Sequence, residues 1–250
     1  MKKDIFRYRI ITNLQCNNRC KFCYQTYKPE KGSDIILSID KLKSTMEKTF
    51  TKNGKLERST LMGGESLLLT NICDYVKITK QYSKTVCLVT NGTLLTEGLL
   101  ENLNNSGLDE IAISIYSINN FNNMIGILTQ ANKIIKNMRV NIPRCEESSD
   151  DKLKLIVEMC LDNDFGCVVC EDLMGRYGEP HDLVISKWEN IFEIKNEHNF
   201  ITYLDTKRQK NFGLFAHYSG YNNTDIIITP LGNFSSWEKY CNKIDNYDLY

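Results

Sequence analysis

The feature that most limits the fold of this chain is a repeated alternation of short apolar runs with stretches of helical periodicity. The first run, FRYRIIT at residues 6–12, is rich in apolar and β-branched residues and is typical of a strand. After a polar connection, apolar residues recur at spacings of three and four from Ile39 to Phe50, and Ser38 is placed to cap this helix. Such alternation predicts parallel strands joined by crossover helices.

The same pattern recurs five times further along the chain. The expected strands are RSTLM (58–62), TVCLVT (85–90), EIAISIY (110–116), MRVNIP (138–143) and DFGCVVCEDLM (164–174), each followed by a helical stripe. The last helix is expected around Trp188, Ile191 and Phe192, because Ser186 and Glu189 form a capping box at its start.

Beyond this helix the alternation weakens. The run NFITYL at 199–204 predicts a seventh strand, and DIIITPLGNFSSW at 225–237 predicts a hairpin that turns at residues 229–232. Pro is scarce and no Gly/Ser-rich linker separates the chain into halves, so we expect one α/β domain. Six strand-helix units form either an open doubly wound sheet or a partial barrel, and periodicity does not separate these folds. Both folds bind ligands at the carboxyl ends of the strands.

Composition excludes several classes of protein. The chain has 31 basic and 31 acidic side chains, so no global field attracts it to nucleic acid or to an anionic membrane. We see no signal peptide at the beginning of the sequence and no apolar run near the ~20 residues that cross a bilayer. We therefore expect a cytoplasmic protein, in which ten cysteines serve metal binding, catalysis or packing rather than disulfides.

Three of these cysteines stand close together after the first predicted strand. Cys16, Cys20 and Cys23 have the spacing Cys-x3-Cys-x2-Cys in a polar loop. An iron-sulfur cubane accepts thiolate ligands, and three of them leave one iron with an open coordination position. Two alternatives remain at this point. A closed zinc site needs a fourth ligand, and the only histidines (His181, His198 and His217) lie more than half a chain away. The third reading is that the cysteines only pack.

The cysteine motif, with the aromatic Phe22 just before its last cysteine, resembles the signature of the radical S-adenosylmethionine (radical SAM) enzymes. A second motif supports this resemblance. LMGGES follows the second predicted strand and resembles the GGEP motif of the family, with Gly63, Gly64 and Glu65 in its places. Two glycines allow backbone to approach a ligand closely, and a carboxylate can receive an ammonium group. The resemblance implies a partial (β/α)6 barrel.

Further segments match the family in the same order. VTNGT after the third strand resembles the TNG element of the family, centred on Asn91. A turn followed by a helix cap would give the same sequence pattern. ISIYS on the fourth strand resembles a segment that places Ser114 beside the ribose or carboxylate of the cofactor. The chain departs from the pattern at two positions, since Tyr116 stands where Asp is common and Ser66 where Pro is common. These departures concern the substrate side of the pocket.

The resemblance implies one 4Fe-4S cluster, held by the three cysteines, and S-adenosylmethionine bound to its open iron. In such enzymes reductive cleavage of this cofactor yields a 5′-deoxyadenosyl radical that abstracts hydrogen from a substrate. By similarity, Glu65 anchors the methionine ammonium, while Phe22 and Val168 contact the adenine. The implied partners are a flavodoxin- or ferredoxin-type reductant and a substrate, without nucleic acid or membrane.

The nearest branches by resemblance are the peptide-modifying and molybdenum-cofactor types, so a ribosomal peptide is the first substrate class and a nucleotide, sugar or amino acid the second. A non-catalytic zinc or iron-sulfur module is the third alternative. Residues 1–200 are the expected barrel core and 201–250 a C-terminal extension. The tail has Ser236 and Trp237 where such extensions usually carry a cysteine, which leaves Cys241 and predicts no auxiliary-cluster domain.

Some residues receive only a default interpretation. Cys160, Cys167 and Cys170 have a cluster-like spacing, but in an extended CVVC the two sulfurs point to opposite faces, so packing is favoured. The remaining candidates are three cysteines expected to pack and four polar residues at strand ends that either line a substrate pocket or are solvated loop residues: Cys73, Cys87, Cys145, Asn141, Arg144, Glu171 and Asp172.

Overall fold

The computed structural model describes residues 7–21, 23, 25, 35–143, 149–170, 191–197, 200–205, 210–215, 225–235 and 239–240. In chain order its elements are β1 (Arg7–Ile11), α1 (Ile39–Asn53), β2 (Leu56–Met62), η1 (Ser66–Leu68), α2 (Ile72–Tyr82), β3 (Ser83–Thr90), α3 (Glu97–Asn105), β4 (Glu110–Ser114), α4 (Ile118–Ile134), β5 (Asn137–Pro143), α5 (Asp150–Asp162), β6 (Gly166–Cys170), β7 (Ile191–Glu197), β8 (Phe200–Asp205), β9 (Lys210–Phe215), β10 (Asp225–Thr229) and β11 (Gly232–Phe234).

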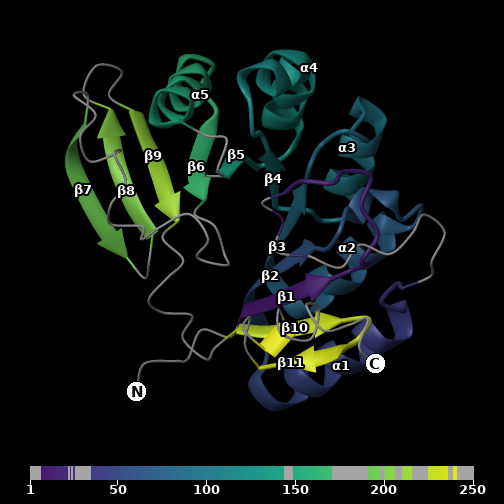
Figure 1. Cartoon of the computed structure of the whole chain (residues 1–250). Coiled ribbons are helices and arrows are strands. Elements are labelled where there is room, and N and C mark those ends of the chain that lie inside the picture. Colours follow the sequence, from purple (N-terminus) through teal and green to yellow (C-terminus); the bar gives the residue numbers. More distant parts are fainter. Residues whose placement is uncertain are drawn as a thin grey trace.

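The strands of this described part belong to one sheet with the order β11-β10-β1-β2-β3-β4-β5-β6-β9-β8-β7. Strands β10, β1 to β6 and β9 run parallel to one another, whereas β11 pairs antiparallel with β10, and β8 pairs antiparallel with both β9 and β7. The sheet is open, with β11 at one edge and β7 at the other. Figure 1 shows α1 to α5 on the outer side of β1 to β6. The prediction of an α/β partial barrel is confirmed.

The helices begin where side-chain caps place them. Ser38, Thr96, Ser117 and Ser149 each accept a hydrogen bond from a backbone N–H in the first turn of the helix that follows. Such caps satisfy donors that have no partner within the helix. The cap at Ser38 is the one that the sequence predicts, and it starts α1 at Ile39 as expected.

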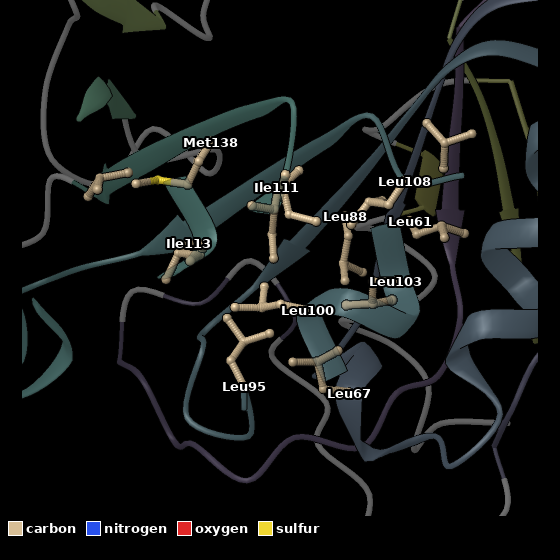
Figure 2. Close-up of a cluster of buried hydrophobic side chains, with 14 of the residues drawn as sticks. Leu61, Leu67, Leu88, Leu95, Leu100, Leu103, Leu108, Ile111, Ile113 and Met138 are labelled. Carbon is tan, nitrogen blue, oxygen red and sulfur yellow. The ribbon is translucent and has the colours of Figure 1, made fainter. Parts of the chain in front are cut away.

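The main core lies between the helices and the outer face of the sheet. Figure 2 shows leucine, isoleucine and methionine side chains of β2 to β5 against those of α3 and the adjoining loops. Ile111 and Ile113 of β4 are fully buried in this core. Glu110 and Ser114 alternate with them and are half-buried on the opposite face, which we call the inner face. In β4 one face therefore holds the fold together, and the other carries the polar side chains Glu110 and Ser114.

A smaller apolar cluster joins the two ends of the printed sequence. Ile11 and Leu14 pack with Met62, Ile227 and Tyr240, and all five are buried. The predicted hairpin is confirmed, because β10 pairs antiparallel with β11 across the turn at residues 230–231. The predicted strand at 199–204 is also confirmed as β8. The division into a core up to residue 200 and an extension stays a prediction.

One predicted element is wrong. Ile191 and Phe192 were expected in a helix but lie in β7, which pairs antiparallel with β8. Main-chain hydrogen bonds to a neighbouring strand outweigh the local capping signal here. Trp188 and the capping-box residues Ser186 and Glu189 lie outside the described residues. The helices described in the structure therefore follow five strands, β1 to β5, and not the sixth.

No helix among the described residues combines the length and the apolar character needed to span a membrane.

Candidate functional site at the carboxyl ends of the strands

The segment after β1 runs directly along the end of β2. The backbone N–H of Gly64 donates to Asn13 O over 2.9 Å, and that of Glu65 donates to Gln15 O over 2.6 Å. A Cβ atom on Gly63 would lie 2.7 Å from Asn13 O, and one on Gly64 would lie 1.9 Å from Gln15 O. Both positions therefore require glycine. The two glycines allow the segment that leads to the cysteines to lie against the Gly63–Glu65 segment. From the sequence we expected these glycines to let the backbone approach a ligand.

Glu65 is the buried centre of this contact. Its side chain is 2 % exposed, and burial raises the pKa of its carboxyl group, although three hydrogen bonds partly offset this effect. Oε1 accepts from the backbone N–H of Leu67 (3.0 Å) and from Thr90 Oγ1 (2.7 Å), and Oε2 accepts from the N–H of Asn91 (2.8 Å). A carboxylate offers about four acceptor positions. Oε2 thus keeps one acceptor position for a further donor.

Ser66, which departs from the family pattern, has a specific contact. It is fully buried, and its Oγ lies 2.9 Å from Thr12 Oγ1. Proline could not make this contact because it has no hydroxyl group. The bond adds a side-chain link between the end of β1 and η1, parallel to the backbone contacts of the glycines.

The three cysteines lie in one half-buried loop. The backbone N–H of Asn18 points at Cys16 Sγ over 3.3 Å, and the N–H of Cys23 donates to Cys20 O over 3.3 Å. Arg19 Nη1 donates to Cys16 O over 2.7 Å. None of the eight described cysteines forms a disulfide. The loop thus presents three sulfur atoms within eight residues, with a hydrogen bond already aimed at one of them.

Within the described residues, no three His, Cys, Asp or Glu side chains stand close enough together to hold a single metal ion. A cluster makes a different demand from a single ion, since each cysteine binds a different iron atom and the sulfurs do not meet at one point. The donor set fits an iron-sulfur cluster because thiolates are its ordinary ligands.

Residues after β3 and β4 hold the cysteine loop in place. Asn17 Nδ2 donates to Thr93 Oγ1, and Asn91 Nδ2 donates to Asn17 Oδ1, both over 2.8 Å. Asn18 Nδ2 donates to Tyr116 OH over 3.4 Å. Asn91 was predicted as a site residue, and the structure brings it to the cysteine loop. The anchoring roles of Asn17 and Thr93 were missed, because they depend on which strand ends are neighbours.

Tyr116 lies closer to the cysteines than its place in the sequence suggested. Burial is the main cause that raises the pKa of its phenol, and the nearby Cys20 and Cys16 raise it further, while the hydrogen bond from Asn18 lowers it. The residue that departs from the family pattern therefore belongs to the surroundings of the candidate metal ligands.

Two other predicted residues lie side by side with Asn141. Ser114 of β4, Asn141 of β5 and Val168 of β6 are paired across adjacent strands. They form a row on the inner face near the carboxyl ends, which we call the strand-end row. Phe22, Arg144, Glu171 and Asp172 lie outside the described residues, as do Cys145, Ser236, Trp237 and Cys241.

The cysteines of α5 and β6 are separated by the strand, as its geometry predicts. Cys160 and Cys167 are buried together in the main core, and their mutual hydrogen bond and burial raise the pKa of Cys167 well above its ordinary value. Cys170 is half-buried, and its sulfur lies 3.8 Å from Val168 O. A pair in the core and a third sulfur on the inner face do not converge on one site.

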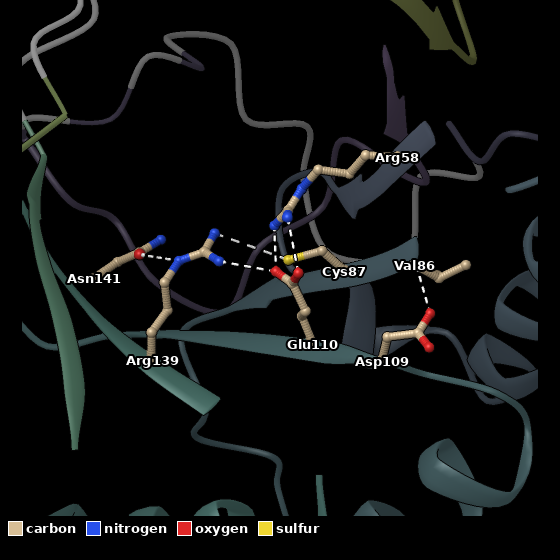
Figure 3. Close-up of polar contacts among 7 residues, drawn as sticks. All are labelled: Arg58, Val86, Cys87, Asp109, Glu110, Arg139 and Asn141. Carbon is tan, nitrogen blue, oxygen red and sulfur yellow. Dashed lines mark hydrogen bonds and ion pairs between the residues drawn. The ribbon is translucent and has the colours of Figure 1, made fainter. Parts of the chain in front are cut away.

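A charged cluster on the inner face was missed by sequence reasoning. Figure 3 shows Arg58 of β2 and Arg139 of β5 on either side of the Glu110 carboxylate of β4, with Cys87 and Asn141 beside them. We call these five residues the inner-face cluster. The signal for it was the single charged position in each of the predicted strands 58–62, 110–116 and 138–143, but its assembly depends on the order of β2, β3, β4 and β5.

These features agree with a comparison to known families. The model of the radical SAM superfamily matches residues 10–160, which include the three loop cysteines, the Gly63–Glu65 segment, Asn91 and Ser114. The chain therefore belongs to the radical SAM superfamily, as the motifs predicted. Enzymes of this family use a 4Fe-4S cluster and S-adenosylmethionine.

Individual relatives cover only part of the chain. An S-adenosylmethionine-dependent nucleotide dehydratase of Lacinutrix mariniflava is 36 % identical over 112 residues, which are 44 % of this chain and 23 % of the relative. A probable GTP 3′,8-cyclase of Methanocaldococcus jannaschii is 30 % identical over 118 residues, which are 47 % of this chain and 38 % of the relative. The chain thus matches less than half the length of either curated relative.

A solved structure shares the fold. The complex of Streptococcus suis SuiB with its precursor peptide SuiA superimposes with a TM-score of 0.60 at 16 % identity, covering 73 % of this chain and 44 % of SuiB. This likeness supports the partial-barrel architecture.

Proposed function

We propose that this protein is a radical SAM enzyme in which Cys16, Cys20 and Cys23 hold the 4Fe-4S cluster and the neighbouring strand ends hold S-adenosylmethionine. The observation that carries this proposal is the backbone contact of the Gly63–Glu65 segment with Asn13 and Gln15, which sets the cysteine loop beside Glu65. When bound, the two groups supply reductive cleavage of S-adenosylmethionine and a 5′-deoxyadenosyl radical that takes hydrogen from a substrate.

The residues of this chain bind the iron-sulfur cluster and S-adenosylmethionine and orient them. The remaining acceptor position of Glu65 Oε2 suits the ammonium of the methionine moiety, because charge-assisted hydrogen bonds to carboxylates are strong. Asn91 holds the cysteine loop through Asn17, so it positions the ligands of the cluster. Ser114 and Val168, together with Phe22, are proposed to border the ribose and adenine.

Anaerobic reconstitution with iron and sulfide tests the proposal. After dithionite and S-adenosylmethionine are added, we expect 5′-deoxyadenosine from the wild type and none from Cys20→Ala, with iron content measured in both. Cys73→Ala is the matched control, because Cys73 is a half-buried cysteine on α2 outside the loop. A cluster-loaded wild type that forms no 5′-deoxyadenosine would favour the non-catalytic module, and undiminished product from Cys20→Ala would refute its role as a ligand.

Two substrate classes have separate support. A peptide is supported by the fold shared with SuiB, which was solved with a precursor peptide. A nucleotide is supported by the two relatives named for nucleotide or GTP chemistry, which match this chain more strongly in sequence. Mass spectrometry of each class after incubation with the reconstituted enzyme separates them. A flavodoxin- or ferredoxin-type reductant remains a prediction.

A further inference from the structure

The inner-face cluster lies on the side of the sheet that the helices do not cover. Glu110 alternates along β4 with Ile111, which is buried in the main core, so the two side chains leave opposite faces. Figure 3 shows the guanidinium groups of Arg58 and Arg139 converging on the carboxylate of Glu110 from the two neighbouring sides. The cluster therefore belongs to the interior of the partial barrel.

The charges of this cluster do not balance. Arg58 Nη1 donates to Glu110 Oε1 over 2.8 Å, its Nη2 donates to Oε2, and Arg139 Nη1 donates to Oε2 over 3.1 Å. In the described part of the chain, one carboxylate thus serves two cations. The side chains of Arg58, Arg139 and Glu110 are only 28 %, 31 % and 14 % exposed. A partly buried excess of positive charge is costly unless an anion compensates it.

Arg139 is the cation held less firmly by Glu110, because only its Nη1 donates to that carboxylate. Its Nε donates to Asn141 Oδ1 over 3.2 Å, and its Nη2 lies 3.9 Å from Cys87 Sγ, a weak acceptor. A guanidinium carries five N–H donors in one plane, and this arrangement matches the oxygens of a phosphate. Arg58, by contrast, directs two of its nitrogens at the same carboxylate.

The cluster is continuous with the proposed site. Asn141 belongs to both, because it accepts from Arg139 and stands between Ser114 and Val168 in the strand-end row. Arg139 precedes Asn141 by two residues on the same face of β5, which is about 7 Å along a strand. A molecule bound at the strand ends can therefore place an anionic group on Arg139.

We propose that the inner-face cluster, through Arg139, binds a phosphate group of a small phosphorylated substrate of the nucleotide type. This inference rests on the proposed function, which locates the reaction at the strand ends. Of the two substrate classes, it selects the nucleotide. A peptide backbone is neutral, so a peptide would compensate the excess charge only through an acidic side chain or its carboxyl terminus. Phosphate brings both the charge and the acceptor oxygens.

Binding of inorganic pyrophosphate to the protein without its iron-sulfur cluster tests the inference without any radical chemistry. By calorimetry at low salt we expect saturable binding to the wild type and at least tenfold weaker binding to Arg139→Gln, with partial recovery in Arg139→Lys. Lys84→Gln is the charge-matched control, because Lys84 forms an exposed ion pair with Glu57 outside the cluster. Circular dichroism checks that each variant folds.

A second variant, Glu110→Gln, tests whether pyrophosphate affinity follows the charge of the inner-face cluster rather than the stability of the fold. Glu110→Gln raises the net charge of the cluster, so it should bind pyrophosphate at least as tightly as the wild type. Absence of saturable binding, or equal affinity of Arg139→Gln and wild type, would overturn the inference. Succinate at the same ionic strength tests whether the site prefers a carboxylate. Tighter binding of succinate than of pyrophosphate would also overturn the inference. None of these outcomes depends on 5′-deoxyadenosine, so failure here leaves the proposed function standing.

Discussion

The two faces of strands β2 to β5 have different compositions and different tasks. The outer face carries buried side chains such as Leu61, Leu88 and Ile111, whereas the inner face carries Arg58, Glu110 and Arg139. Strands of a parallel sheet that is covered on both faces are usually apolar throughout. The alternation seen here indicates that the outer face of these strands packs in the main core, whereas the inner face combines a charged region around Glu110 with apolar packing around Met62.

The largest expected effect comes from the outer face. Ile111→Ala removes a fully buried side chain from the main core and should lower the free energy of unfolding by about 2–5 kcal/mol. Leu155→Ala on α5 is the control, because its side chain is 42 % exposed and the loss should stay below about 1 kcal/mol. Urea denaturation of both variants measures the difference. Equal losses would contradict the assignment of the core.

The excess of positive charge on the inner face predicts that removing the charge of Glu110 lowers stability more than removing the charge of Arg139. Glu110→Gln leaves two guanidinium groups facing each other and should cost about 2–3 kcal/mol, less than the value for a fully buried pair because the arginines are partly exposed. Arg139→Gln leaves the bidentate Arg58–Glu110 pair intact and should cost about 1 kcal/mol or less. Urea titrations at low and high salt check this order. A larger loss in Arg139→Gln would show that the positive charge is not in excess.

Glu65 has an intermediate expected effect. Glu65→Gln replaces an acceptor oxygen by an amide that repels the N–H and O–H donors around it, which should cost about 1–3 kcal/mol. Thr93→Ala, which alters the exposed contact with Asn17, is the milder control.

The raised pKa of Glu65 also predicts that the stability of the fold depends on pH. Because burial raises the pKa of the Glu65 carboxyl group above its ordinary value of 4.5, the ionised form is less stable in the fold than in the unfolded chain. Its stabilising contribution is full below about pH 4.5 and is lost as the pH rises through the raised pKa. The stability of the wild type relative to Glu65→Gln should therefore fall with rising pH in this window. Urea midpoints between pH 4 and 8 would contradict the prediction if the difference grew instead.

Tyr116→Phe has the smallest expected effect on stability, below about 1 kcal/mol, because the hydrogen bond that its hydroxyl accepts from Asn18 is long at 3.4 Å. Asn18 also directs its backbone N–H at Cys16 Sγ, and hydrogen bonds to the sulfurs tune a cluster. The reconstituted variant should therefore bind normal amounts of iron and show a shifted reduction potential, measured by redox titration with electron paramagnetic resonance. Tyr82→Phe, far from the cysteines, is the control, and identical potentials would exclude this positioning role.

Local patterns predicted the parts of the fold that depend on local forces. The periodicity of α1 and its cap at Ser38, the hairpin of β10 and β11, and the opposite directions of Cys167 and Cys170 all follow from residues close in sequence. The helix expected at Ile191 failed for the complementary reason, since pairing with β8 decided its conformation.

The site shows the same boundary between what sequence can and cannot predict. The motifs predicted Glu65, Asn91 and the cysteines as site residues, but not that the carboxylate of Glu65 would accept a hydrogen bond from the N–H of Asn91. The glycines were expected to admit a ligand, and they admit the backbone of Asn13 and Gln15. Contacts of this kind require the pairing order of the strands, which no local pattern contains.

The position of β1 has a consequence for biosynthesis. β1 lies between β2 and β10, and Lys41 Nζ also donates to Thr229 O over 3.0 Å. A ribosome releases β1 and the cysteine loop well before it releases β10, which is the tenth strand in chain order. Until then one edge of β1 remains unpaired, and exposed strand edges invite aggregation. The cysteine loop therefore reaches its final surroundings late in synthesis, and cluster insertion in the cell should follow completion of the chain through β10.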